Sequence, residues 1–224
     1  MISAASRHYV SVRVQASLGA CSLAPGFQTV MEYTVYGSGD LIIDTEVSPR
    51  TDLPYLPRMG LQLRLPGEFD RLAWYGRGPH ECYPDRQESA AVGVYEGLVE
   101  EQYVPYLRPQ EYGNKTEVRW ATVTNTRGEG LLVVAMPLLN VSVHQYTDEM
   151  LDRARHPHEL TPCSDIILNL DHRLGGLGSN SCGPETLPQY RVWPEPTDFS
   201  LRLRPLSEGD CPMRLSKLKC VKDD

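Results

Sequence analysis

The sequence predicts an all-β protein, built as a large antiparallel β-sandwich of two sheets. Stretches that alternate apolar with polar residues, as half-buried strands do, recur along most of the chain. Eighteen glycines and eighteen prolines supply turns between these stretches. Only one convincing helix start is present, at Thr147. We therefore expect about ten short strands and one short helix.

Size and charge exclude several classes of protein. The 224 residues suit one β-rich domain, and the 41% hydrophobic content is ordinary for a globular core. The net charge of −7 without a basic run argues against nucleic acid or an anionic membrane as a partner. Arg7 and Arg13 interrupt the first residues, and no apolar run is long enough to span a membrane. We expect a soluble, cytoplasmic protein.

The first half of the chain contains the clearest strand patterns. Residues 9–16 alternate, and residues 29–36 and 41–47 alternate on either side of the turn Gly37–Asp40, which makes them the best candidate β-hairpin. Residues 58–65 alternate again, and residues 70–74 form a strand that leads into a loop.

Later segments are expected as follows. Residues 90–102 begin like a helix, but Gly93 and Gly97 oppose it, so their structure stays open. The remaining strands are expected at residues 117–125, 130–136, 141–144, 166–171 and 199–203, with a Thr147-capped helix at 147–154. Residues 1–206 should form the domain and residues 207–224 a C-terminal tail whose end frays.

The stretch Trp74–Arg86 is the best candidate for a functional loop. It places four charged side chains, one histidine, two glycines, two prolines and three aromatic residues in thirteen positions. Glycine and proline fix the backbone, so the side chains can be aimed at a ligand. Asp85 and Arg86 suggest an ion pair that locks the loop. A rigid turn whose charges pair with one another is an equally open interpretation.

This stretch also resembles the GRGPHENYPDR signature of the C-terminal domain of large β-galactosidases of glycoside hydrolase family 2. Three later segments match the same family in the same order, and together the matches cover about residues 55–204. They are Tyr106–Trp120, Ala154–Leu160 and Asn169–Pro184. Cys82 and Tyr112 replace asparagines of the commoner family motifs, which removes amide hydrogen-bonding groups.

The resemblance implies a fold similar to galactose mutarotase, a two-sheet supersandwich. By that comparison the chain begins partway through the family domain and lacks its first strands. A sheet without its opening strands exposes edges and apolar surface, which a partner would cover.

The resemblance also implies a function. In the family, both catalytic glutamates lie on a separate barrel domain, and this chain has no β/α repeat that could form one. The chain would then be a small chain or C-terminal domain that completes the galactoside site of a larger hydrolase. Its partners would be a β-galactoside and a barrel-containing chain, within an oligomer. The barrel would supply both carboxylates of a retaining mechanism and hold any Mg²⁺ and Na⁺, with no cofactor in this chain.

Family motifs point to substrate-binding rather than catalytic residues. Cys182 stands where a tryptophan stacks on the sugar in better-known members, and a thiol offers no such face, so a small space-filling role is favoured there. The residues expected to line the sugar site are His80, Glu81, Arg86, Glu111, Asn114, Asn180 and Cys182.

Two other functions stay open. One is a non-catalytic carbohydrate-binding domain. The other is an aldose-epimerase-like enzyme that uses His80 or His144 with Glu81 or Glu111.

A metal site has weaker support in the sequence. His156-Pro157-His158 beside Glu159 suggests ligands, but the proline and the spacing favour a loop-bracing or surface role. The six cysteines form no CxxC pair, which favours reduced thiols over a zinc site.

Overall fold

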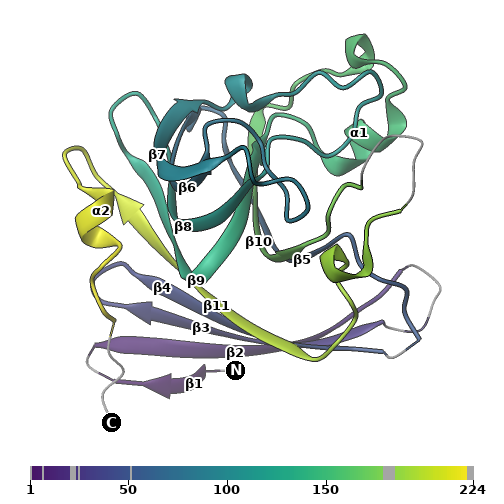
Figure 1. Ribbon diagram of the computed structural model, residues 1–224. Coiled ribbons are helices and arrows are strands. Elements are labelled where there is room, and N and C mark those ends of the chain that lie inside the picture. The colour runs from purple at the N-terminus through teal and green to yellow at the C-terminus, as the bar shows by residue number, and fades with distance from the viewer. Residues whose placement is uncertain are drawn as a thin grey trace.

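Eleven antiparallel strands form one continuous hydrogen-bonded sheet in the computed structural model, which describes residues 2–6, 8–20, 24, 26–50, 52–178 and 185–220 (Figure 1). The strands are β1 (Ile2–Ala5), β2 (Tyr9–Leu18), β3 (Phe27–Tyr36), β4 (Leu41–Pro49), β5 (Arg58–Pro66), β6 (Arg71–Gly78), β7 (Ala91–Leu98), β8 (Lys115–Thr124), β9 (Gly130–His144), β10 (Asp165–Leu174) and β11 (Thr197–Leu206). The helical segments are α1 (Asp148–Arg153), α2 (Pro212–Leu215) and the 3₁₀ turns η1 (Glu100–Gln102), η2 (Pro157–Glu159) and η3 (Pro188–Tyr190). Within the described residues, no helix is long and apolar enough to cross a membrane.

Strand β9 folds the sheet into two layers. Its residues 130–136 pair with β11, and its residues 140–144 pair with β10. The switch occurs around the cis Met136–Pro137 peptide bond. The hydrogen-bonded path runs β1-β2-β3-β4-β11-β9-β8-β6-β7, and β10 with β5 branches from the second half of β9. Strand β8 pairs with both halves of β9. The predicted all-β antiparallel sandwich is confirmed, with its two layers joined through β9.

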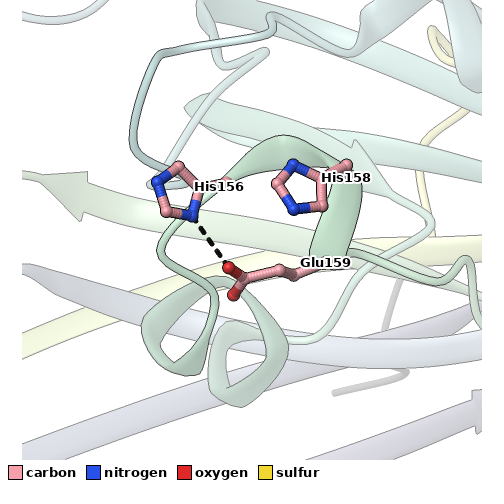
Figure 2. A group of neighbouring side chains, drawn as sticks. All are labelled: His156, His158 and Glu159. Carbon is pink, nitrogen blue, oxygen red and sulfur yellow. Dashed lines mark hydrogen bonds and ion pairs between the residues drawn. The ribbon is translucent and has the colours of Figure 1, made fainter.

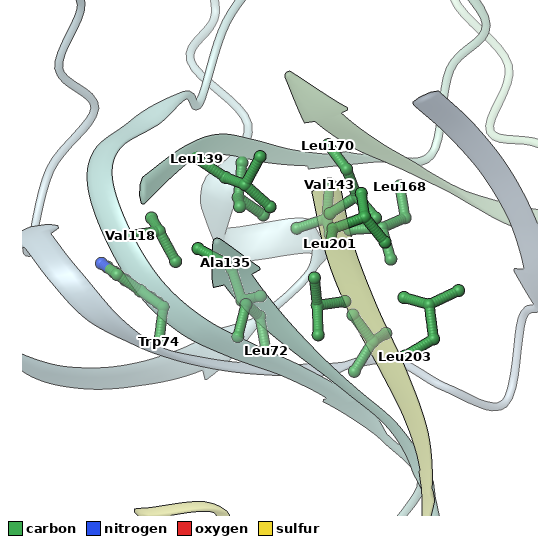
Figure 3. Close-up of a cluster of buried hydrophobic side chains, with 14 of the residues drawn as sticks. Leu72, Trp74, Val118, Ala135, Leu139, Val143, Leu168, Leu170, Leu201 and Leu203 are labelled. Atoms are coloured by element: carbon green, nitrogen blue, oxygen red, sulfur yellow. The ribbon is translucent and has the colours of Figure 1, made fainter. Parts of the chain in front are cut away.

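The hydrophobic core lies between these layers. Leu201 and Leu203 of β11 pack in one buried cluster with Leu168 and Leu170 of β10 and Trp74 of β6 (Figure 3). Burying each such leucine contributes about 2 kcal/mol relative to leaving it in water. This packing, repeated across both layers, holds the sandwich closed.

The predicted hairpin is confirmed. Strands β3 and β4 pair in register from Phe27 opposite Pro49 to Val35 opposite Leu41. The turn between them contains Gly39 at φ +86°, a conformation that favours glycine. The predicted helix cap is also present, because the Thr147 side chain accepts a hydrogen bond from the Met150 N–H at 3.3 Å.

Several segments differ from the sequence expectations. Residues 2–5, where no strand is expected, form β1, and residues 75–78, expected in a loop, complete β6. Residues 91–98, whose pattern does not decide between helix and strand, form the strand β7. Residues 130–144, expected as two strands, form the single 15-residue strand β9.

The C-terminal residues contact the sheet. Leu215 of α2 is buried, and the Arg202 guanidinium donates hydrogen bonds to the carbonyl oxygens of Leu215 and Leu218. The division into a domain and a tail at residue 207 stays a prediction.

Candidate functional site

The loop after β6 holds neighbouring loops through Glu81. The Glu81 Oε1 atom accepts hydrogen bonds from Arg86 Nη2, at 2.6 Å, and from the Tyr106 hydroxyl. The Oε2 atom accepts the Gly113 N–H at 2.8 Å. The Glu81 side chain is 11% exposed, so its carboxylate serves mainly to join this loop to residues 106–113.

Asp85 in the same loop holds the segment that follows β10. Its carboxylate accepts the N–H groups of Leu177, at 3.2 Å, and Gly178, at 2.8 Å. A Cβ atom added at Gly176 would lie 2.5 Å from the Asp85 Cγ atom, so only glycine permits this approach. Arg86 pairs with Glu81, and this corrects the expected Asp85–Arg86 ion pair.

Asn114 and Cys82 form a buried backbone link. The Cys82 N–H donates to the Asn114 carbonyl, and the Asn114 Nδ2 atom donates to the Cys82 carbonyl, both at 2.8 Å. Both residues are fully buried. His80 is exposed, and its Nε2 atom lies 2.9 Å from the Ser89 hydroxyl.

A cavity of about 660 Å³ lies beside these loops and α1. Segments from five parts of the chain form its walls. The lining residues are Tyr55–Arg58, Arg108–Glu111, Asp148, Leu151, Asp152, Leu174–Leu177, Thr186, Tyr190 and Arg191. Charged side chains of both signs therefore surround one concave surface, which is where small ligands are usually bound.

Arg58 joins two carboxylates at the edge of this cavity. Its Nη2 atom lies 2.7 Å from Asp171 Oδ2, and its Nη1 atom lies 3.0 Å from Glu111 Oε2. Burial opposes the charge of Arg58, but Asp171 and then Glu111 outweigh it and raise its pKa. Burial also disfavours the charged form of Asp171 and raises the pKa of its carboxyl group, although the nearby Arg58 acts to lower it.

Glu111 is the titratable group of the cavity wall. Burial raises its pKa to about 7, although Arg58 acts in the opposite direction. Its second oxygen, Oε1, is buried without a hydrogen-bond partner among the described residues. Glu111 can therefore donate or accept a proton near neutral pH, in a position that faces the cavity.

His144 lies behind Glu111 rather than in the cavity. Its Nε2 atom donates to the Tyr112 carbonyl at 3.0 Å and lies 4.0 Å from Glu111 Oε1. The His144 side chain is 0% exposed, and burial lowers its pKa to about 3. A neutral, enclosed imidazole cannot touch a sugar directly, which removes His144 as the acid or base of an epimerase.

The rim of the cavity carries two further arginines. Arg108 is exposed and forms no ion pair within the part of the chain that the structure describes. Arg191 pairs with Glu185 at 2.8 Å and lies 4.7 Å from the centre of the Tyr55 ring. Arg108 is thus the cation at the rim that is able to donate hydrogen bonds to a ligand.

The structure separates the residues that the sequence grouped as one site. Glu111 lines the cavity, whereas Glu81, Arg86 and Asn114 hold the loops beside it and His80 contacts Ser89. Asn180 and Cys182 lie outside the described residues. Their assignment to a sugar site stays a prediction.

Sequence reasoning missed Arg58, Asp171, Arg108 and Arg191. One signal was available, because Asp171 ends an apolar strand and a buried carboxylate needs a partner. Nothing local identified that partner as Arg58, which is 113 residues away.

Comparison with known proteins agrees with this architecture. A family model described as "Beta galactosidase small chain" matches residues 2–203. The β-galactosidase of Priestia megaterium is 36% identical over 186 residues, which cover 83% of this chain and 18% of that protein. The β-galactosidase of Arthrobacter sp. (strain B7) is 39% identical over 175 residues, 75% of this chain and 17% of that protein.

A third relative shows the same relation. The β-galactosidase of Vibrio cholerae is 36% identical over 182 residues, which cover 81% of this chain and 17% of that protein. The chain thus spans less than a fifth of the length of these relatives. Since the family model matches nearly all of the described sandwich, the chain belongs to the β-galactosidase small-chain family.

Proposed function

We propose that this chain completes the galactoside-binding site of a larger β-galactosidase and acts together with a barrel-containing chain or domain. The observation that carries the proposal is the convergence of separate family motifs on one cavity. Residues 108–111 and 174–177 line it, and Asp85 of the loop after β6 holds the second of these segments in place.

The carboxylates of this chain support a role in binding rather than in bond cleavage. Glycoside hydrolysis needs two carboxyl groups on either side of the scissile bond. Glu81 is occupied by Arg86, Tyr106 and Gly113, and Asp171 is buried against Arg58. We assign both catalytic carboxylates, and any Mg²⁺ or Na⁺ of the assembled enzyme, to the barrel of the partner, as the family resemblance implies. Glu111, Asp148 and Asp152 line the cavity, and we assign them a role in binding.

Arg108 and Glu111 are the side chains best placed to bind a sugar. The Arg108 guanidinium offers N–H donors at the rim, and sugar hydroxyl oxygens accept such bonds. Glu111 lines the cavity with 23% of its side chain exposed and a pKa of about 7, so its carboxyl group can exchange hydrogen bonds with a hydroxyl group there. We further expect the assembled enzyme to be an oligomer in the cytoplasm.

The proposed binding role is tested with Arg108→Ala in enzyme reconstituted from this chain and a barrel-containing large chain. Hydrolysis of a chromogenic β-galactoside should show a KM raised about tenfold, the loss expected for one hydrogen bond to a charged donor. Arg127→Ala is the matched control, because Arg127 lies in the β8–β9 turn and does not line the cavity. Equal KM values for both variants would contradict the role of the cavity in sugar binding.

A non-catalytic carbohydrate-binding domain is the second candidate. It is favoured by the cavity itself, which residues of this chain form without a partner. Galactose binding by the isolated chain, lost in Arg108→Ala, together with no stimulation of any large chain, would select this second function.

A further inference from the structure

The segment after α1 brings a histidine and a glutamate onto one face of a tight turn. His156 is the N-cap residue of η2, and Glu159 is the last residue of that 3₁₀ turn. Side chains three residues apart in a 3₁₀ helix lie on the same side. The His156 Nδ1 atom accordingly lies 2.8 Å from Glu159 Oε1 (Figure 2).

A second imidazole joins this pair. The His158 ring stacks on the His156 ring with centroids 5.4 Å apart and an angle of 16° between the planes. Ligand-type atoms of His156, His158 and Glu159 all lie within 4.8 Å of one another. Among the described residues, this is the one group of three histidine, cysteine or acidic side chains with that geometry.

We propose that His156, His158 and Glu159 form a surface binding site for a divalent transition-metal ion of the Zn²⁺ class. Two imidazoles and one carboxylate, with water as a fourth ligand, are a ligand set that Zn²⁺ accepts. Imidazole ligands favour such ions over Mg²⁺ and Ca²⁺, which prefer oxygen.

The ligand-type atoms of the three side chains are close enough to reach one ion after small side-chain rotations. Bonds of about 2.0–2.2 Å in a tetrahedral arrangement place ligand atoms roughly 3.4 Å apart. The longer separations, up to 4.8 Å, must therefore shorten when an ion binds, and the 2.8 Å separation of His156 Nδ1 and Glu159 Oε1 must open slightly. The three side chains are exposed, with 61% of the His156 side chain and 39% of the Glu159 side chain accessible, so rotation about their χ angles disturbs no core packing.

The backbone already orients the carboxylate. The Arg155 N–H donates to Glu159 Oε2 at 3.0 Å, so the carboxylate is fixed by its own loop. A bound ion would replace the His156–Glu159 hydrogen bond and leave the Arg155 bond in place as an outer support.

The test is a calorimetric titration of the whole chain with Zn²⁺ at pH 7.5, in excess Mg²⁺. Accessible thiols such as that of Cys211 are first alkylated, because thiolates also bind Zn²⁺. We expect one Zn²⁺ per chain. His158→Ala should weaken binding at least about tenfold, as loss of a ligand does, and His8→Ala, which changes an exposed histidine elsewhere, should leave it unchanged.

A second variant shows whether weaker Zn²⁺ binding in His158→Ala comes from the lost ligand or from disturbed folding. Glu159→Gln keeps the size of the side chain but lowers its basicity, and it should also weaken Zn²⁺ binding severalfold. Binding of the wild-type strength by both His158→Ala and Glu159→Gln would overturn the proposal. So would the absence of a one-to-one site in the wild-type chain, which would leave the three side chains as a brace for their own loop.

Discussion

Arg58 and Asp171 are 113 residues apart in the sequence, yet Arg58 Nη2 lies 2.7 Å from Asp171 Oδ2. The contact forms because β5 pairs with β10, which places Gly60 directly opposite Asp171. A Cβ atom at Gly60 would lie 2.6 Å from Asp171 Oδ1, so glycine leaves room for the carboxylate. Arg58 then reaches across to Glu111 and ties the paired strands to the wall of the cavity.

Removing Arg58 should destabilise the fold. Arg58→Met leaves the Asp171 carboxylate, whose side chain is 4% exposed, without its counter-charge. Breaking a buried pair in this way costs about 3 kcal/mol. Urea unfolding of the variant should show a loss of this size, and the double variant Arg58→Met/Asp171→Leu should recover most of it. A loss below about 0.5 kcal/mol in the single variant would show that the pair is not effectively buried.

Glu111 should make stability fall as the pH rises. Its pKa is raised from 4.5 to about 7 in the folded chain. Between these values the folded state holds a proton that the unfolded state has lost, so the free energy of unfolding decreases as the pH increases through this window.

The matched variant for this effect is Glu111→Gln, which cannot titrate. From pH 5 to pH 8 the wild type should lose stability relative to the variant by at most about 3 kcal/mol. Unfolding measured at half-unit pH steps provides the comparison. Parallel curves for the two proteins would show that Glu111 titrates normally.

Lys115 should produce the opposite slope at higher pH. Its side chain is buried, with Nζ 5.0 Å from the centre of the Trp74 ring, and burial lowers its pKa from 10.5 to about 8. The unfolded state binds the extra proton between these values, so the wild type should gain stability from pH 8 to pH 10. Lys115→Met should lack this gain, and a wild-type curve parallel to that of the variant would contradict the lowered pKa.

Gly176→Ala should disturb the cavity wall. The new methyl group would meet the Asp85 carboxylate at about the 2.5 Å separation found for an added Cβ, and relief requires movement of one of the two loops. We expect a loss of about 1–3 kcal/mol. Gly37→Ala is the control, because its nearest neighbour would be the His8 carbonyl at 3.8 Å. If both variants unfolded at the same urea concentration, the close contact between these loops would be ruled out.

Local patterns were sufficient for the hairpin of β3 and β4 and for the Thr147 cap, because alternation and turn chemistry act between near neighbours. Local patterns did not predict β7, because Gly93 and Gly97 oppose a helix and interrupt the alternation typical of a strand. A Cβ at Gly93 would lie 3.1 Å from the Tyr95 ring, so its small size is set by packing. They also divided β9 at Pro137, since the change of pairing partner there depends on tertiary structure.

The candidate site was predicted less completely than the fold. The family motifs identified Glu111, but they could not show that Glu81 and Asn114 are used to hold loops. Those roles depend on contacts between segments that are 25 or more residues apart. Arg58 lies outside the four matched segments. Its partners come from β10 and from the loop before β8, so only the folded structure shows that it belongs to the site.

The most direct test of the proposed function compares the purified chain alone with the chain mixed with a barrel-containing large chain. The readout is hydrolysis of a chromogenic β-galactoside, titrated with increasing amounts of this chain. We predict no turnover by the chain alone and turnover that rises to saturation in the mixture. Hydrolysis by the isolated, contaminant-free chain would contradict the proposal that both catalytic carboxylates belong to a partner.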